Sequence, residues 1–309
     1  MDKEKIMNCG ICSHEGGEEQ GYHRKCLRSL FGKPALPEIK LKLSDVPLEA
    51  QKMAGKMSIS GVQPKLIMSI EKGRLVPVSS GGLFILKPQT EAFRSLPENE
   101  NTCMNITQRL KIDVPPHGLF KLEDGTMAYI VRRFDRSSPN ERKRCEDFSQ
   151  ILGIGKYKGS VELVGRKLME ISEFPGIDAQ LLFERVLLNF LVGNGDAHLK
   201  NYSVLEDDSG KLRLSPAYDI VCSKLVIPDE EDSALTINGK HNRISRGDFE
   251  KLAGYLKIPD KPTADIFFRM SEIKNVAKKM INSSMLENED MELVLDIVEE
   301  RYPRIYSNR

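Results

Sequence analysis

The chain of 309 residues is 40% hydrophobic and 29% charged, and its 46 Lys and Arg nearly balance 45 Asp and Glu, for a formal net charge of +1. A chain of this length buries a sizeable core, and near-neutrality excludes a protein that binds nucleic acid or anionic membranes through its own net charge. No apolar run approaches the ~18 residues of a membrane-spanning helix, and six cysteines are too sparse for a disulfide scaffold. We therefore expect a cytoplasmic protein with reduced thiols and no membrane partner.

The first 136 residues predict a short N-terminal segment and a β-rich lobe. Residues 1–56 contain scattered Gly and Pro and no clear periodicity. From residue 57, β-branched and aromatic residues bounded by Gly or Pro predict strands, and turn residues separate them. The expected order within 57–136 is strands at 62–70 and 82–87, a helix at 99–110, and strands at 118–121 and 126–134, with turns at 71–73 and 123–125.

The remainder of the chain, 137–309, has a helical pattern. Apolar residues at 3.6-residue spacing predict helices, and a short strand-like insertion at 202–214 surrounds a turn at 208–210. The expected helices are 146–152, 161–172, 178–192, 246–256, 263–283 and 290–301. A β-rich N-lobe followed by an all-helical C-lobe is an α+β fold, and the two lobes join near 134–140.

The most informative segment is Asn189–Asn201, where an apolar helix ends at a glycine and a polar loop follows. Asp196 and Asn201 have the spacing of a kinase catalytic loop, in which the Asp orients the substrate hydroxyl and the Asn binds Mg²⁺. Asp219 follows where kinases carry a second Mg²⁺-binding carboxylate, although the Asp-Phe-Gly signature is absent. Taken alone, Gly-Asn-Gly-Asp is equally consistent with an ordinary turn.

Two features of the β-rich lobe favour the kinase interpretation. Lys87 ends an apolar strand, as does the kinase lysine that pairs with ATP phosphates and with a helix glutamate. Glu100 is the expected partner and Glu98 the fallback, while an ordinary strand-end lysine that reaches solvent is the alternative. Residues Ser58–Lys65 lie where a phosphate-binding loop belongs, but their single glycine makes this signal weak.

Together these segments resemble HipA-family serine/threonine kinases, the toxins of bacterial toxin–antitoxin systems. The resemblance spans residues 55–300 and rests on Ser58–Lys65, Phe84–Pro88, Asn99–Glu100, Arg133–Arg136, Gly193–Asn201 and Pro216–Asp219. It implies a two-lobed, protein-kinase-like fold, Asp196 and Lys200 as catalytic residues, and Asn201 and Asp219 as Mg²⁺ ligands. The ATP-binding residues that it implies are Ser60, Gly61, Val62, Gln63, Lys65, Lys87, Glu100, Arg132, Phe134, His198 and Tyr218.

Within that family, the short N-terminus resembles the HipT type, because only 57 residues precede Ser58. This resemblance implies a separate HipS-like small protein, a HipB-like helix-turn-helix antitoxin that alone contacts DNA, and an aminoacyl-tRNA synthetase as the protein substrate. It also implies autophosphorylation at Ser58 or Ser60, which would place about −2 charges beside ATP. Two ordinary hydroxyls on a turn are the alternative.

Cys9, Cys12, His23 and Cys26 depart from the family pattern. Cys-x₂-Cys followed by His-x₂-Cys offers four ligands for tetrahedral Zn²⁺ within residues 9–26, with His14 as a substitute. The second pair is spaced more closely than in usual zinc fingers, so reduced thiols in a surface segment are the alternative.

The sequence therefore predicts a Mg²⁺- and ATP-dependent serine/threonine protein kinase that acts as a toxin. Two other classes of protein stay open: a small-molecule phosphotransferase of the aminoglycoside type, which shares the Asp–Asn loop, and an inactive antitoxin-binding module. Phosphate on Ser58 or Ser60 that is lost in an Asp219→Ala variant favours the protein kinase. Failure to bind ATP favours the inactive module.

Overall fold

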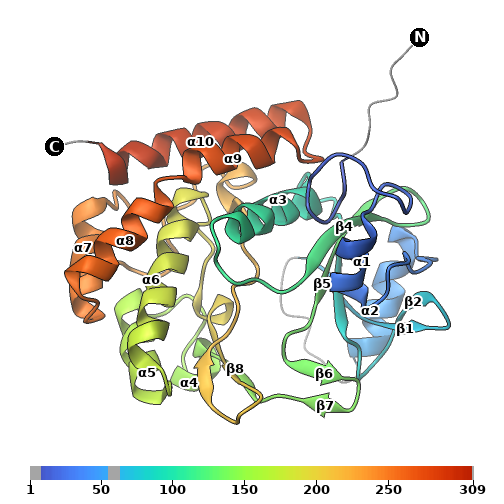
Figure 1. Cartoon of the computed structure of the whole chain (residues 1–309), viewed down its shortest axis with the longest axis horizontal. Helices are drawn as coiled ribbons and strands as arrows, with labels where there is room; N and C mark the ends of the chain where they lie inside the picture. Colours follow the sequence, from blue (N-terminus) through green and yellow to red (C-terminus); the bar gives the residue numbers. More distant parts are fainter. Residues whose placement is uncertain (1–7, 55–62, 308–309) are drawn as a thin grey trace. The chain divides into compact units, whose positions relative to one another are not determined.

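The computed structural model describes residues 8–54 and 63–307, and the chain forms two compact units (Figure 1). The first unit comprises Met1–Asn105, Pro115–Arg142 and Asn282–Glu287. The second comprises Ile106–Val114, Lys143–Ile281 and Asn288–Arg309. Each unit is therefore built from segments that are distant in the sequence.

The first unit contains a five-stranded antiparallel sheet with the strand order β2-β1-β3-β5-β4. Its strands are β1 (Leu66–Glu71), β2 (Arg74–Pro77), β3 (Phe84–Pro88), β4 (His117–Lys121) and β5 (Met127–Arg132). The sequence pattern predicted four of these strands and missed β2. Lys72 and Gly73, which join β1 to β2, have φ of 50° and 82°, as a two-residue type I′ hairpin turn requires.

The N-terminal segment is more regular than its composition suggests, because its described part contains α1 (Arg24–Phe31) and α2 (Val46–Ala54). Gly32 ends α1 with φ of 77°, a common helix stop. Apolar side chains of this segment and of the sheet share one core, which includes Leu27, Leu30, Phe31, Leu66, Met68 and Leu86. Burial stabilises each such leucine by about 1.5–3 kcal/mol. The N-terminal segment thus forms helices that its residue pattern does not predict.

A helix and a small hairpin complete the first unit. The predicted helix at 99–110 is α3 (Leu96–Arg109), of which the last turn belongs to the second unit. A hairpin of β6 (Arg136–Ser138) and β7 (Glu141–Arg142), which the sequence pattern did not indicate, begins within the predicted join at 134–140.

The second unit is mostly helical. Its helices are α4 (Phe148–Leu152), α5 (Val161–Ile171), α6 (Pro175–Leu191), α7 (Arg246–Tyr255), α8 (Asp260–Met270), α9 (Ile273–Asn282) and α10 (Asn288–Tyr306). The single helix expected at 263–283 is two helices, which a turn at Ser271 and Glu272 separates; the Ser271 hydroxyl donates to the Phe268 carbonyl at 2.7 Å in this turn. None of the helices within 8–54 and 63–307 combines the length and apolarity that a bilayer-spanning helix requires.

The description of the C-lobe as all-helical needs one correction. The second unit also contains a three-stranded antiparallel sheet, ordered β10-β9-β8, from β8 (Cys145–Asp147), β9 (Ser203–Glu206) and β10 (Leu212–Leu214). The strand-like insertion at 202–214 supplies β9 and β10, as expected. β8 is too short for a periodic pattern to reveal it.

α6 forms the centre of the second unit. Every residue from Leu182 to Leu191 is buried, which is typical of a helix that is surrounded by its own domain. The Phe183 and Phe190 rings lie 6.1 and 5.6 Å from the ring of Phe249 on α7. A helix held in this way fixes the position of the polar loop that begins directly after it.

Candidate active site

The loop after α6 is held closely at its first residues. Gly193 has φ of 74°, and a Cβ atom there would lie 2.5 Å from Ile297 Cγ2, so a larger residue would strain the backbone and force the Ile297 side chain to move. The Gly195 N–H donates to Ser223 Oγ at 2.9 Å. These contacts fix the direction in which the chain reaches Asp196.

Asn201 and Asp219 lie in contact although they are 18 positions apart in the sequence. Asn201 Nδ2 donates to Asp219 Oδ2 at 2.6 Å, and Asn201 Oδ1 accepts from the His198 N–H at 2.9 Å. Asp219 has φ of 60°, a left-handed backbone that costs a non-glycine residue about 1–3 kcal/mol. Such strain persists only where the surrounding structure holds the residue in place, and here it accompanies the approach of the carboxylate to Asn201.

The side chains of this pair are of the type that binds a hard divalent cation such as Mg²⁺, which the Asn201 amide would meet through Oδ1. An amide oxygen and a carboxylate are oxygen ligands of the kind that Mg²⁺ prefers, and Mg²⁺ commonly keeps its other positions for water and phosphate oxygens. Asn201 is buried and Asp219 is half-buried, so both side chains are held by their surroundings more firmly than surface side chains are.

Asp196 is oriented by a tyrosine that sequence reasoning missed. Tyr157 Oη donates to Asp196 Oδ1 at 2.8 Å, and its ring meets the His198 ring edge-on at 5.2 Å. Partial desolvation, and then the hydrogen bond to Asp196, raise the pKa of Tyr157 to about 12, so the phenol remains a donor. Tyr157 stands between Lys156 and Lys158 in a loop, and an exposed aromatic among lysines is the only signal that the sequence carried.

His198 is buried within the same loop. Burial lowers the pKa of its imidazole, so the neutral ring is favoured. Among the described residues its Nδ1 has no hydrogen-bond partner. The backbone N–H of His198 donates a hydrogen bond to the Asn201 side chain. The imidazole ring of His198 is available for a polar group that enters the site.

Tyr218 and Lys200 lie at the far end of the loop. Tyr218 Oη donates to the Lys200 carbonyl at 2.7 Å and also bonds the hydroxyl of Ser203 at the start of β9. Burial raises the pKa of Tyr218 above its ordinary value. The Lys200 side chain is exposed. Tyr218 thus positions the loop backbone, while Lys200 is accessible to a ligand.

Glu230 is a second residue beside the loop that sequence reasoning missed. Its carboxylate accepts a hydrogen bond from the Ser223 hydroxyl. The same hydroxyl accepts a hydrogen bond from the Gly195 N–H. Burial is the main cause that raises the pKa of Glu230, and the charge of Asp196 adds to it. Nothing in the sequence around Glu230 distinguishes it from other acidic loop residues.

In the first unit, Lys87 and Glu100 form the ion pair that the sequence pattern suggested. Lys87 Nζ lies 2.7 Å from Glu100 Oε1, and the two side chains are 15% and 5% exposed. Lys87 Nζ also lies 5.8 Å from the centre of the Tyr129 ring. A nearly buried pair between β3 and α3 holds the ammonium group in one place, as a phosphate-binding lysine requires.

The predicted phosphate-binding loop is only partly described. Ser58, Ser60, Gly61 and Val62 lie outside the described residues. Gln63 Nε2 donates to the Pro88 carbonyl at 2.8 Å, and this contact ties the end of the loop to β3 immediately after Lys87. The next predicted residue, Lys65, is exposed.

Arg132, which the family resemblance implies as an ATP-binding residue, and its neighbour Arg133 already use their backbone N–H groups. The Arg132 N–H donates to the Pro116 carbonyl and the Arg133 N–H to the Leu83 carbonyl, each at 2.8 Å. A backbone contact of Arg132 with ATP would therefore have to use its carbonyl. Phe134, the other predicted residue, is half-buried.

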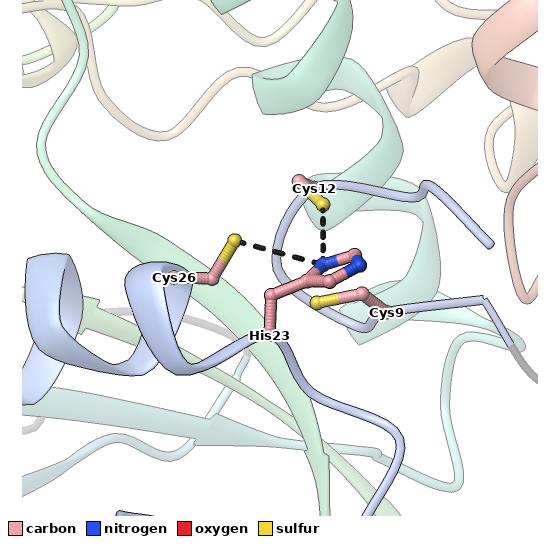
Figure 2. A group of neighbouring side chains, drawn as sticks. All are labelled: Cys9, Cys12, His23 and Cys26. Atoms are coloured by element: carbon pink, nitrogen blue, oxygen red, sulfur yellow. Dashed lines mark hydrogen bonds between the residues drawn. The ribbon is translucent and has the colours of Figure 1, made fainter. Parts of the chain in front are cut away.

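The four N-terminal cysteine and histidine side chains converge (Figure 2). One ligand atom from each of Cys9, Cys12, His23 and Cys26 lies within 4.8 Å of the others. The exposed His14, considered as a substitute, is not part of this group. This cluster belongs to the first unit, in which Lys87 and Glu100 also lie.

Comparison with known proteins settles the family. Residues 57–285 match the model of the HipA-like C-terminal domain. The chain belongs to the HipA-like C-terminal domain family. It is 31% identical over 243 residues, 71% of its length, to a Sinorhizobium fredii protein named "Putative kinase Y4dM". It is 29% identical over 225 residues to the serine/threonine-protein kinase toxin HipA of Shewanella oneidensis, covering 62% of this chain and 49% of that protein.

A solved structure confirms the fold of this chain. HipA in the complex of Shewanella oneidensis HipA, HipB and operator DNA superposes with a TM-score of 0.67 at 22% identity, over 81% of this chain and 64% of that one. The predicted kinase-like α+β fold is therefore correct. The chain spans about half of the curated relatives that it matches, with coverages of 58%, 55% and 46% of their lengths.

Proposed function

We propose that this HipA-like chain is a Mg²⁺- and ATP-dependent kinase that phosphorylates serine or threonine side chains of a protein and acts as a toxin. The observation that carries the proposal is the 2.6 Å contact between Asp219 and Asn201, which belongs to the loop that also presents Asp196. Kinases need these three groups together: two to hold Mg²⁺ and one to orient the attacking hydroxyl.

The second unit would supply the chemistry of the attacking hydroxyl. Asp196, oriented by Tyr157, accepts the hydrogen bond and then the proton of the substrate hydroxyl at a carboxylate oxygen. Lys200 offers an exposed positive charge that would stabilise the negative charge on the transferring group. Asn201 and Asp219 would hold Mg²⁺, which when bound neutralises charge on the phosphates of ATP.

The first unit would supply a phosphate contact. Lys87 carries a positive charge that Glu100 holds in a fixed position, and an ammonium group in this setting pairs with phosphate oxygens. The predicted loop residues Ser60 to Lys65 would add backbone N–H donors to these oxygens. The ATP-binding assignments of Arg132, Phe134, His198 and Tyr218 remain predictions from the family resemblance.

The biological setting is proposed from the relatives. The Shewanella oneidensis relative is named as a HipA toxin, and its solved structure contains HipB and operator DNA. By this similarity we propose a HipB-like antitoxin as a partner of the present chain, with DNA contacted only through that partner. An aminoacyl-tRNA synthetase as substrate, a HipS-like protein as second partner and the HipT type remain parts of the proposal that rest on the family resemblance.

Transfer of labelled phosphate from ATP to the chain itself and to bacterial protein extract tests the proposal. We expect Asp196→Asn to lower the rate by about 10²–10⁴-fold, because the substituted amide accepts no proton. Asp208→Asn, at an exposed aspartate of the same unit, is the matched control and should transfer phosphate at the wild-type rate. Unchanged transfer by the Asp196→Asn protein would contradict the assignment.

Mass spectrometry of the phosphorylated chain then tests autoregulation. We expect phosphate on Ser58 or Ser60 in wild type and none on either residue in Asp196→Asn. Phosphate added to a small aminoglycoside, with no phosphate on any protein, would instead support the small-molecule phosphotransferase.

A further inference from the structure

We propose that Cys9, Cys12, His23 and Cys26 bind one structural Zn²⁺ ion. Cys12 Sγ lies 3.4 Å and Cys26 Sγ 4.0 Å from His23 Nδ1, and all four ligand atoms fall within 4.8 Å of one another (Figure 2). Ligand atoms at ~2.3 Å (sulfur) and ~2.0 Å (nitrogen) from a tetrahedral Zn²⁺ are about 3.5–3.8 Å apart. The cluster thus has nearly the dimensions of a zinc site.

A separate backbone hydrogen bond holds each half of the proposed site in place. At the first half, the Ser13 N–H donates to the Cys9 carbonyl at 2.8 Å, and this tight turn brings the Cys9 and Cys12 sulfurs to the same side. At the second half, His23 is the residue before α1 and Cys26 lies in its first turn, where the Cys26 N–H donates to the His23 carbonyl at 2.9 Å. A turn pair and a helix-start pair are the usual components of a small structural zinc site.

Ordinary packing of thiols does not account for this arrangement. Cys103 and Cys222 show what a packed cysteine of this chain looks like: each is buried and neither belongs to a cluster of metal-ligating side chains. In the N-terminal cluster, three sulfurs and one ring nitrogen point toward a common centre instead. Four protein ligands of the sulfur and imidazole kind complete the coordination of Zn²⁺ and leave no open position, which indicates a structural site and not a catalytic one.

The site lies where it would fix the edge of the sheet. β4 is an edge strand, and edge strands present unpaired backbone groups. The Leu119 N–H of β4 donates to the Gly10 carbonyl at 2.8 Å, and the Leu119 carbonyl accepts from Tyr22 Oη at 2.9 Å. Gly10 lies between the first two proposed ligands and Tyr22 precedes the third. A bound metal would therefore fix the positions of Gly10 and Tyr22, which form the two hydrogen bonds to the backbone of Leu119.

A further contact connects the site to α3. Asn105 Nδ2 on α3 donates to Ser13 Oγ at 3.2 Å, next to Cys12, and both residues are buried. α3 also carries Glu100, the partner of Lys87. Zn²⁺ would thus stabilise the surroundings of this ion pair from outside the proposed kinase site, and the proposal does not depend on kinase activity.

Metal analysis of the purified full-length chain tests the proposal. We expect about one zinc per chain by mass spectrometry, and after exchange into Co²⁺ the visible absorption of a tetrahedral thiolate site. Cys12→Ser and Cys26→Ser should lose both signals. Cys145→Ser, at a half-buried cysteine outside the cluster, is the matched control and should keep them.

A second pair of variants separates ligation from loss of folding. His23→Cys should retain zinc, because four thiolates also form a tetrahedral site, whereas His23→Ala should lose it. His14→Ala should bind zinc as wild type does. Protease digestion of the zinc-free chain should cut near α1 several-fold faster than digestion of the loaded chain.

Either of two results would overturn the proposal. One is background zinc in wild type purified without chelator, together with no tetrahedral Co²⁺ spectrum. The other is iron with acid-labile sulfide in place of zinc.

Discussion

The two clusters proposed to hold metals, Cys9–Cys26 and Asn201–Asp219, differ in ligand chemistry. The first offers three thiols and an imidazole, which suit Zn²⁺, and the second offers an amide and a carboxylate, which suit Mg²⁺. The first supplies a complete set of four ligands, whereas the second supplies two and leaves the remaining positions to other oxygens. A complete set serves stability, and an incomplete set serves chemistry on a bound phosphate.

The same contrast appears in how the backbone holds each cluster. The N-terminal ligands come from a turn and a helix start within 18 residues, so their convergence is local. The oxygen pair depends on the rest of the second unit, because Asp219 takes a strained backbone to reach Asn201. We therefore expect removal of Zn²⁺ to unfold the N-terminal cluster locally. Removal of Mg²⁺ should stop phosphate transfer without unfolding the chain around Asn201 and Asp219.

Among the residues proposed to hold metals, Asp219 should show the largest effect. Asp219→Asn removes one charge from the proposed Mg²⁺ site, and loss of that charge stabilisation should slow phosphate transfer by about 10³-fold. Zinc content should stay at the wild-type level, since Asp219 and the Cys/His cluster belong to different units. Asp208→Asn serves as the control. A phosphate-transfer rate within threefold of wild type would contradict the assignment of Asp219 to a catalytic Mg²⁺ site. The two clusters would then no longer differ in role as proposed.

The next effect concerns acid stability at the edge strand β4, beside the proposed zinc site. Burial lowers the pKa of His117 to about 4, from an ordinary value near 6.5. Below pH 6.5 the unfolded imidazole binds a proton that the folded one does not, so stability falls as the pH drops toward 4. For this fully buried ring the loss amounts to about 3 kcal/mol.

Urea unfolding between pH 7 and pH 4 measures this loss. His117→Gln, which is neutral throughout, should show a flatter dependence than wild type by about 3 kcal/mol. The comparison is made in the Cys26→Ser background as well, because protonation of zinc ligands also destabilises the first unit in acid. Equal pH dependence with and without His117 in that background would contradict the prediction.

Much of the fold and of the candidate site follows from local sequence. Lys87 at a strand end and the Asp196–Asn201 spacing are visible because one element carries each of them. The contact of Tyr157 with Asp196 and the position of Glu230 beside Gly195 were missed, because they depend on how distant segments pack. Short elements were missed for a different reason, since β2 and β8 contain too few residues for a pattern to repeat.

The smallest expected effect is on Tyr157, the residue that orients Asp196. Tyr157→Phe removes one hydrogen bond to a carboxylate, at a side chain that is 53% exposed, and should lower kcat by about five- to tenfold, the equivalent of about 1 kcal/mol. The KM for ATP should not change, because a positioning residue of this kind acts on the attacking hydroxyl and not on the nucleotide. Tyr255→Phe, at an exposed tyrosine of the same unit, should behave as wild type. An increase in KM with kcat unchanged would instead mean that Tyr157 contacts the ligand. The ligand would then be held by Tyr157 as well as by Asn201 and Asp219.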